Sequence, residues 1–125
     1  MPATKEDYIQ YRVKNSQQML KDAKALADME SWNSCLNRLY YSAYYLVSAL
    51  LYKNNIKAHT HTGIKTQFNL HFIKDESAYK ELGRLYSNLF DWRQESDYAD
   101  FVDFDEKTVI PLIDEARDLT KGLWS

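Results

Sequence analysis

Apolar residues recur every three or four positions along most of this 125-residue chain, and this spacing constrains the fold more than any other feature. Because an α-helix completes a turn in about 3.6 residues, such spacing gathers apolar side chains on one helical face. The segment from Glu6 to about Met29 carries one apolar stripe opposite a face of charged and amide side chains. We therefore expect a surface helix with one buried side.

The second segment, from Trp32 to Tyr52, carries two apolar stripes instead of one. The first is mainly aliphatic, and the second contains Tyr41, Tyr45 and Tyr52. A helix that is apolar on two faces either lies in the middle of a bundle or gives its second face to a partner subunit. We expect this helix to do both, forming the centre of the bundle and the seam of a homodimer.

The remaining sequence contains three more helical patterns. They extend from Thr60 or Thr62 to Phe72, from after Ser77 to Arg93, and from Asp105 to Leu123, with residues 96–104 as an acidic, aromatic connector. Pro111 falls inside the last pattern, where proline removes a helix hydrogen bond and crowds a carbonyl group of the preceding turn. We therefore expect a kink or a later helix start at Pro111.

Glycine and proline are scarce, which also favours helices. The chain holds only 3 Gly and 2 Pro, too few for the many tight turns of an all-β fold. Its length is typical of a single domain, and no repeat or linker divides it. We predict an all-α, antiparallel up-and-down bundle of about five helices that comprises residues 1–125 as one domain.

Cysteine content and hydropathy predict the compartment. Cys35 is the only cysteine, so the chain can form neither an internal disulfide nor a thiolate metal cluster. No apolar stretch approaches the roughly 18 residues of a membrane span, and the amino-terminal residues lack the apolar core of a signal peptide. We expect a cytoplasmic protein with no membrane partner.

The charge balance provides no general attraction to nucleic acid. Sixteen Lys and Arg residues stand against 18 Asp and Glu residues, which gives a net charge of −2. Because polyanions are bound mainly through Lys and Arg, any RNA site must be a local one. Nothing in the sequence indicates specificity for DNA.

The sequence gives little support to a cofactor or metal site. Its glycines stand alone and far apart, so no glycine-rich phosphate loop is present. His59, His61 and His71 have no cysteine or clustered carboxylate at metal-ligand spacing. We therefore predict no cofactor and no metal.

A run in the second helix resembles a known family. Arg38-Leu39-Tyr40-Tyr41-Ser42-Ala43-Tyr44 is similar to the Arg-x-Tyr-Tyr-x-Ala-aromatic run of HEPN domains. Further stretches resemble one small bacterial and archaeal HEPN subgroup in the same order: His61-Thr62-Gly63-Ile64, Phe68 with Phe72-Ile73-Lys74, Glu81-Leu82-Gly83-Arg84-Leu85, and Arg93-x-x-x-Asp97-Tyr98. The resemblance covers roughly residues 31–100.

The resemblance implies a dimeric helical bundle that is often encoded beside a minimal nucleotidyltransferase, in toxin–antitoxin or defence systems. Many HEPN domains are metal-independent RNases in which an Arg-x(4–6)-His motif from two subunits meets in one cleft. The arginine fork stabilises the added charge on the phosphate, and the histidine moves the proton of the attacking 2′-hydroxyl.

This chain lacks the histidine of that motif. Arg93 is followed by Gln94, and no histidine occurs after His71. Unperturbed Asp and Tyr titrate near 3.9 and 10, so Asp97 and Tyr98 are poorly matched to proton transfer at neutral pH. The RNase motif is therefore incomplete.

His61 and Arg93 each have two possible roles. His61 can replace the missing histidine, or it can anchor the start of the third helix through a hydrogen bond, which we expect. Arg93 and Asp97 can form an ordinary helix-surface ion pair, or Arg93 can face a functional cleft with Asp97 orienting it and Tyr98 closing over it.

Our first functional hypothesis is a dimeric module that binds RNA or a nucleotide, or mediates an interaction, together with a nucleotidyltransferase partner. The alternative is an active metal-independent endoribonuclease that uses Arg93 with a substitute acid–base residue. A purely structural helical subunit is a third possibility. The candidate binding residues are Arg93, Asp97, Tyr98, Arg38 and His61, and Arg93 is the candidate catalytic residue.

Overall fold

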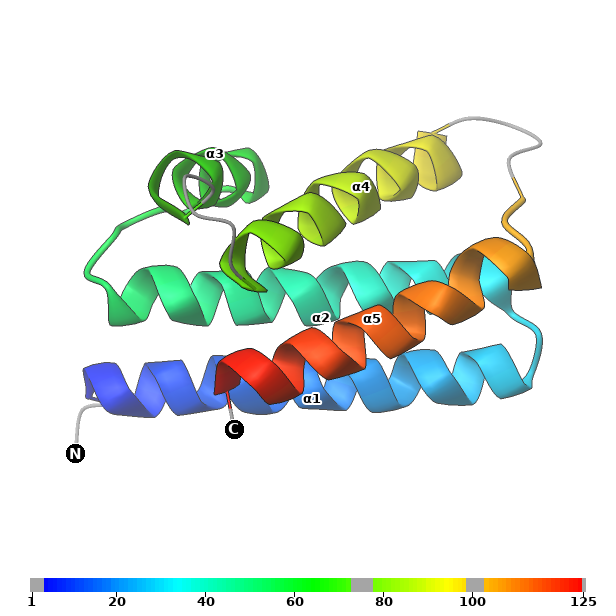
Figure 1. Cartoon of the computed structure of the whole chain (residues 1–125), viewed down its shortest axis with the longest axis horizontal. Coiled ribbons are helices and arrows are strands. Elements are labelled where there is room, and N and C mark those ends of the chain that lie inside the picture. Colours follow the sequence, from blue (N-terminus) through cyan, green and yellow to red (C-terminus); the bar gives the residue numbers. More distant parts are fainter. Residues whose placement is uncertain (1–3, 73–77, 99–102, 125) are drawn as a thin grey trace.

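The computed structural model describes residues 4–72, 78–98 and 103–124, which form five helices and no strand. The helices are α1 (Lys5–Asp28), α2 (Trp32–Lys53), α3 (His61–Phe72), α4 (Ala78–Tyr98) and α5 (Glu106–Trp124). The predicted all-α bundle is therefore confirmed. Figure 1 shows α1 and α2 running antiparallel along the molecule, with α5 crossing them obliquely and α3 seen nearly end-on.

The structure decides three predicted boundaries, two of them through local hydrogen bonds. The Thr60 hydroxyl accepts a hydrogen bond from the Gly63 amide at 2.8 Å, so Thr60 and not Thr62 caps α3. The Asp105 carboxylate accepts from the Thr108 amide at 2.9 Å, so α5 starts at Glu106 and the later start at Pro111 was wrong. The predicted connector was too long, because α4 continues through Tyr98 without a proline or glycine to stop it.

The first two helices approach closely because small polar residues face each other between them. The Ser16 hydroxyl donates to the Ser42 carbonyl at 2.7 Å, and the Ser42 hydroxyl donates to the Ser16 carbonyl at 2.9 Å. Both serines are buried, so this reciprocal pair satisfies polar groups that would otherwise destabilise the contact. The result is a close α1–α2 pair on which the other helices pack.

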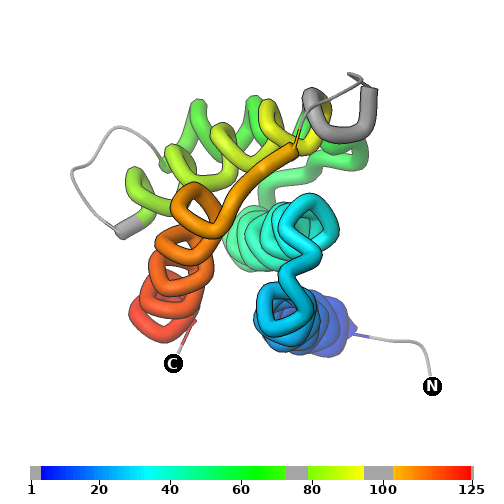
Figure 2. The backbone as a smooth tube through the Cα atoms, turned by 90° about the vertical axis from the view of Figure 1, so that its right-hand side faces the viewer, coloured from blue at the N-terminus to red at the C-terminus, as the bar shows by residue number. Residues whose placement is uncertain are grey.

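The second helix is the centre of the molecule, as the two apolar stripes predict. It contacts each of the other four helices, and Figure 2 shows it between α1 and the layer formed by α3 and α4. Twelve of its residues are buried. One of them is Tyr40, which lay in neither predicted stripe and yet has no exposed surface.

Two properties of the described residues bear on function. No helix among them is both long enough and apolar enough to cross a membrane. Cys35 is buried, and burial raises the pKa of its thiol to about 11, so the reactive thiolate is not populated near neutral pH.

Candidate functional site

The centre of the candidate site is a contact between α2 and the first residue of α3. The Tyr40 hydroxyl and Nδ1 of His61 form a hydrogen bond of 2.6 Å. The His61 ring also stacks on Tyr44, with the ring centroids 4.4 Å apart and the planes 17° from parallel. Ile64 and Phe68, which are both buried, anchor α3 on the core and so fix the imidazole over α2.

Arg93 reaches the same tyrosines from α4. Its guanidinium carbon lies 5.0 Å from the centroid of Tyr40 and 5.5 Å from that of Tyr41. Nη2 of Arg93 donates to the Tyr41 hydroxyl at 3.4 Å. The arginine is half-buried, so its stem packs against the bundle while its planar group lies on aromatic faces.

We call Tyr40, Tyr41, Tyr44, His61 and Arg93 the aromatic site. Arg38 borders it, because its guanidinium carbon lies 5.5 Å from the Tyr41 centroid. Two guanidinium groups therefore contact one tyrosine ring.

Burial and charge set the protonation states at the site. Burial, and then the positive charge of Arg93, lower the pKa of His61, so its imidazole is neutral near pH 7. Burial raises the pKa of Tyr40, whose phenol therefore stays protonated. The imidazole of His61 therefore carries no positive charge that would repel the guanidinium of Arg93.

The structure brings together three of the five predicted binding residues. Arg93, His61 and Arg38 all lie around Tyr40 and Tyr41. The hydrogen bond expected of His61 is present, although its partner is a tyrosine hydroxyl. Asp97 and Tyr98 lie in the last turn of α4, and their side chains are outside the described part of the chain, so their contacts with Arg93 stay a prediction.

Tyr40 and Tyr44 were not among the predicted site residues, although the family resemblance includes them. Tyr40 and Tyr44 are four residues apart and therefore share one helical face. That signal was available, but it was overlooked because the aliphatic stripe already accounted for the core. Tyr86 could not be found this way: its hydroxyl donates to the His61 carbonyl at 3.5 Å from another helix, which only the fold reveals.

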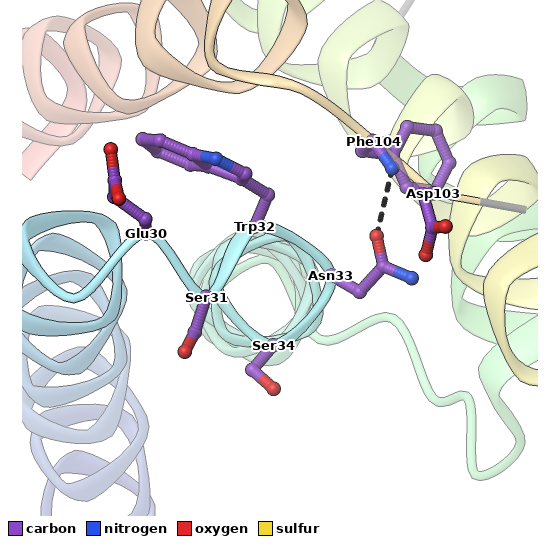
Figure 3. Close-up of a pocket in the computed structure, with 7 residues that line it drawn as sticks. All are labelled: Glu30, Ser31, Trp32, Asn33, Ser34, Asp103 and Phe104. Atoms are coloured by element: carbon purple, nitrogen blue, oxygen red, sulfur yellow. Dashed lines mark hydrogen bonds between the residues drawn. The ribbon is translucent and has the colours of Figure 1, made fainter.

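A separate hollow of about 360 Å3 lies at the start of α2 and is shown in Figure 3. Its wall includes the side chains of Glu30, Trp32 and Asp103, and the Phe104 amide donates to Asn33 Oδ1 at 2.9 Å. The two carboxylates disfavour a phosphate ligand there. Among the residues with described placement, no group of three His, Cys, Asp or Glu is arranged to hold a metal.

Comparison with known proteins agrees with the resemblance seen in the sequence. The family model described as the HEPN domain matches residues 9–122. A UPF0332 protein of Thermotoga maritima is 38% identical over 113 residues, which are 90% of this chain and 86% of the relative. A UPF0332 protein of Archaeoglobus fulgidus is 24% identical over 113 residues, covering 89% of this chain and 88% of that protein.

Another relative carries a functional name. A protein of Methanocaldococcus jannaschii that is named as a candidate toxin is 29% identical over 86 residues. The match covers 69% of this chain and 58% of that protein. The family match over nearly the whole chain, together with the all-helical bundle, shows that this chain belongs to the HEPN domain family.

Proposed function

We propose that this chain is a toxin-type HEPN protein whose aromatic site binds a phosphate group of RNA or of a nucleotide. The observation that carries the proposal is the position of the Arg93 guanidinium, 5.0 Å from the Tyr40 centroid and beside the Tyr41 hydroxyl. A planar guanidinium can offer two parallel N–H donors to phosphate oxygens, and tyrosine faces next to it can stack on a base.

The wider biological role follows from family membership. Relatives of this chain are named as candidate toxins, which supports a toxin-type function. The HEPN subgroup that this chain resembles is often encoded beside a minimal nucleotidyltransferase. We therefore include a nucleotidyltransferase partner in the proposal. We also include a homodimer, because Tyr41, Tyr44 and Tyr45 on α2 remain only half-buried in the single chain.

A second candidate, a metal-independent endoribonuclease, is favoured by one specific observation. Arg93 and His61 both contact Tyr40, although they come from different helices. In such a reaction the 2′-oxygen attacks the adjacent phosphorus, the bond to the 5′-oxygen breaks, and a cyclic phosphate forms. His61 would accept the 2′-hydroxyl proton, which is finally delivered to the leaving 5′-oxygen, while Arg93 would stabilise the phosphate charge.

Arg93 substitutions test the binding proposal. Calorimetry with a short single-stranded oligoadenylate should show that Arg93→Ala weakens binding roughly 10- to 150-fold, because charged hydrogen bonds are lost. Arg93→Lys should recover little of that loss, since a point charge cannot make bidentate contacts. Arg84→Ala is the matched control, because Arg84 is exposed and pairs with Glu81 on α4. Equal affinity of Arg93→Ala and wild type would overturn the proposal.

The same variants separate binding from cleavage. The purified protein is incubated with labelled RNA in a chelator, and the products are resolved on a gel. If the protein binds RNA without cleaving it, the RNA stays intact, and Arg93→Ala still weakens the binding. Cleavage that disappears in both Arg93→Ala and His61→Ala, while His61→Ala still binds RNA, would establish the endoribonuclease instead.

A further inference from the structure

A second group of aromatic and basic side chains lies where the start of α1 meets the end of α2. Two cavities of about 80 and 130 Å3 flank Tyr52 there, and both are also lined by Ile56 and Lys57. Arg12 and His59 line the smaller one. We call Arg12, Tyr52, Lys57 and His59 the Tyr52 surface.

The charged residues of this surface are basic. The residues that line the two cavities include no Asp or Glu. Arg12 is half-buried, and neither it nor Lys57 makes a hydrogen bond or ion pair with any residue that the structure describes. Arg117, by contrast, pairs with Asp114 at 3.2 Å.

In the part of the chain that the structure describes, the carboxylates at the start of α1 bond to neutral groups near them and do not pair with Arg12 or Lys57. The Asp7 carboxylate accepts a hydrogen bond from the Thr4 amide at 2.9 Å, and the Asp7 amide donates to the Thr4 hydroxyl at 3.1 Å. Glu6 accepts from the Gln10 amide at 2.9 Å. The Tyr52 surface therefore carries two cations, Arg12 and Lys57, that form no ion pair with a carboxylate of the described residues.

Aromatic rings are exposed beside these cations. Tyr52 is 38% exposed and Tyr8 is 50% exposed. Their ring centroids lie 6.1 Å apart with the planes at 56°, so the two rings touch without covering each other's faces completely. Proteins bind single-stranded nucleic acid with exposed aromatic rings beside basic side chains. The bases stack on the rings, and the phosphates pair with the basic groups.

One face of α2 connects this surface to the aromatic site. Tyr41, Tyr45, Ser48 and Tyr52 follow one another at spacings of four, three and four residues and so form one stripe. Tyr41 accepts the Arg93 hydrogen bond at one end of this stripe, and Ser48 lines the cavity at the other. A helix rises about 1.5 Å per residue, which separates Tyr41 from Tyr52 by roughly 17 Å along the axis.

We propose that the Tyr52 surface binds single-stranded RNA next to the segment held at the aromatic site. Arg12 and Lys57 pair with consecutive phosphates, and Tyr52 stacks on the base between them. This proposal rests on the proposed RNA binding at Arg93 and extends it to a second, independent group of contacts.

A protein partner fits this surface less well than RNA does. In a twofold symmetric dimer the same patch occurs on both subunits, so a seam centred here would place Arg12 and Lys57 opposite their own copies. Like charges held close together oppose such a contact. The absence of carboxylates from the cavity walls thus favours a polyanion.

The test measures affinity and salt dependence with a fluorescent oligoadenylate carrying 2′-O-methyl riboses, which cannot be cleaved through its 2′-oxygen. Arg12→Ala and Lys57→Ala should each reduce the slope of log affinity against log salt by about 0.7. Tyr52→Ala should weaken binding roughly 5- to 150-fold, whereas Tyr52→Phe keeps the ring and should bind as wild type does. Lys14→Ala, on another face of α1, is the exposed control.

The outcomes separate this proposal from the proposed function. If Arg93→Ala weakens binding and the Arg12, Lys57 and Tyr52 variants do not, the Tyr52 surface is not an RNA site. If only the Tyr52-surface variants weaken binding, this site stands and the assignment of Arg93 fails. Loss of dimer mass in Tyr52→Ala, with RNA affinity unchanged, would instead make Tyr52 a subunit contact and overturn the proposal.

Discussion

The hydroxyl of Tyr40 lies 2.6 Å from Nδ1 of His61, so one hydrogen bond joins the middle of α2 to the first residue of α3. The same tyrosine ring lies under the guanidinium of Arg93, which comes from α4. Tyr40 therefore holds together two groups that the sequence places far apart. Its burial explains why this arrangement can be rigid, since the ring has no exposed surface.

We expect the Tyr40–His61 bond to stabilise the fold modestly. Tyr40→Phe and His61→Ala each remove it and should lower the free energy of unfolding by about 1 kcal/mol. Because both changes break the same bond, the double variant should lose less than the sum of the two single losses. Urea unfolding of the four proteins gives the coupling. Strict additivity would mean that the bond contributes nothing.

Stability should also depend on pH through His61. Its pKa is lowered in the folded protein, so the unfolded chain binds the proton more tightly. The free energy of unfolding should therefore rise with pH from below the folded pKa up to the ordinary value of about 6.5, and level off above it. Thermal melts at several pH values should show that stability depends less on pH in His61→Gln than in the wild type. His71→Gln, at an exposed position, is the control and should behave as wild type does.

Arg93 should influence the titration of His61 through its charge. Since that charge contributes to the lowered pKa of His61, Arg93→Ala should raise it, and Arg93→Lys should leave it nearly as in wild type. An NMR titration of the imidazole signals measures this directly. A His61 pKa that does not move in Arg93→Ala would show that the two groups are further apart in solution.

Core packing around α2 gives a stability prediction with a matched control. Leu46 is 1% exposed, and Leu46→Ala should destabilise the protein by roughly 2–5 kcal/mol because it leaves a cavity. Leu70 is 57% exposed, and Leu70→Ala should change the free energy of unfolding by less than about 0.5 kcal/mol. Comparable losses in the two variants would contradict the central position of α2.

The predicted homodimer is tested by mass. One chain has a mass of 14.8 kDa, and light scattering at micromolar concentration should return twice that value. We expect Tyr45→Asp to favour the monomer, because Tyr45 is only half-buried on the α2 stripe and a charge there opposes an apolar seam. A monomer mass for the wild type would contradict the prediction that α2 forms a subunit contact.

The sequence by itself determined the helices and their order. Apolar spacing located α1 and α2 to within a residue or two, because a helix that buries one face must repeat its apolar side chains at helical period. The sequence also identified the family, because the run around Tyr40 and Tyr41 is a local motif that can be read without the fold. The ends of the helices depend on single capping residues: Asp105 caps α5 and lets the helix start ahead of Pro111.

Only the tertiary structure decided which chemical groups meet. Sequence spacing gave Arg93 no histidine, yet the packing of α3 and α4 on α2 brings His61 and Arg93 to the same tyrosine ring. The Tyr52 surface likewise depends on the start of α1 lying beside the end of α2, which places Arg12 and Lys57 at one cavity. Such contacts depend on where whole helices cross, and local periodicity carries no information about the distance between residues on different helices.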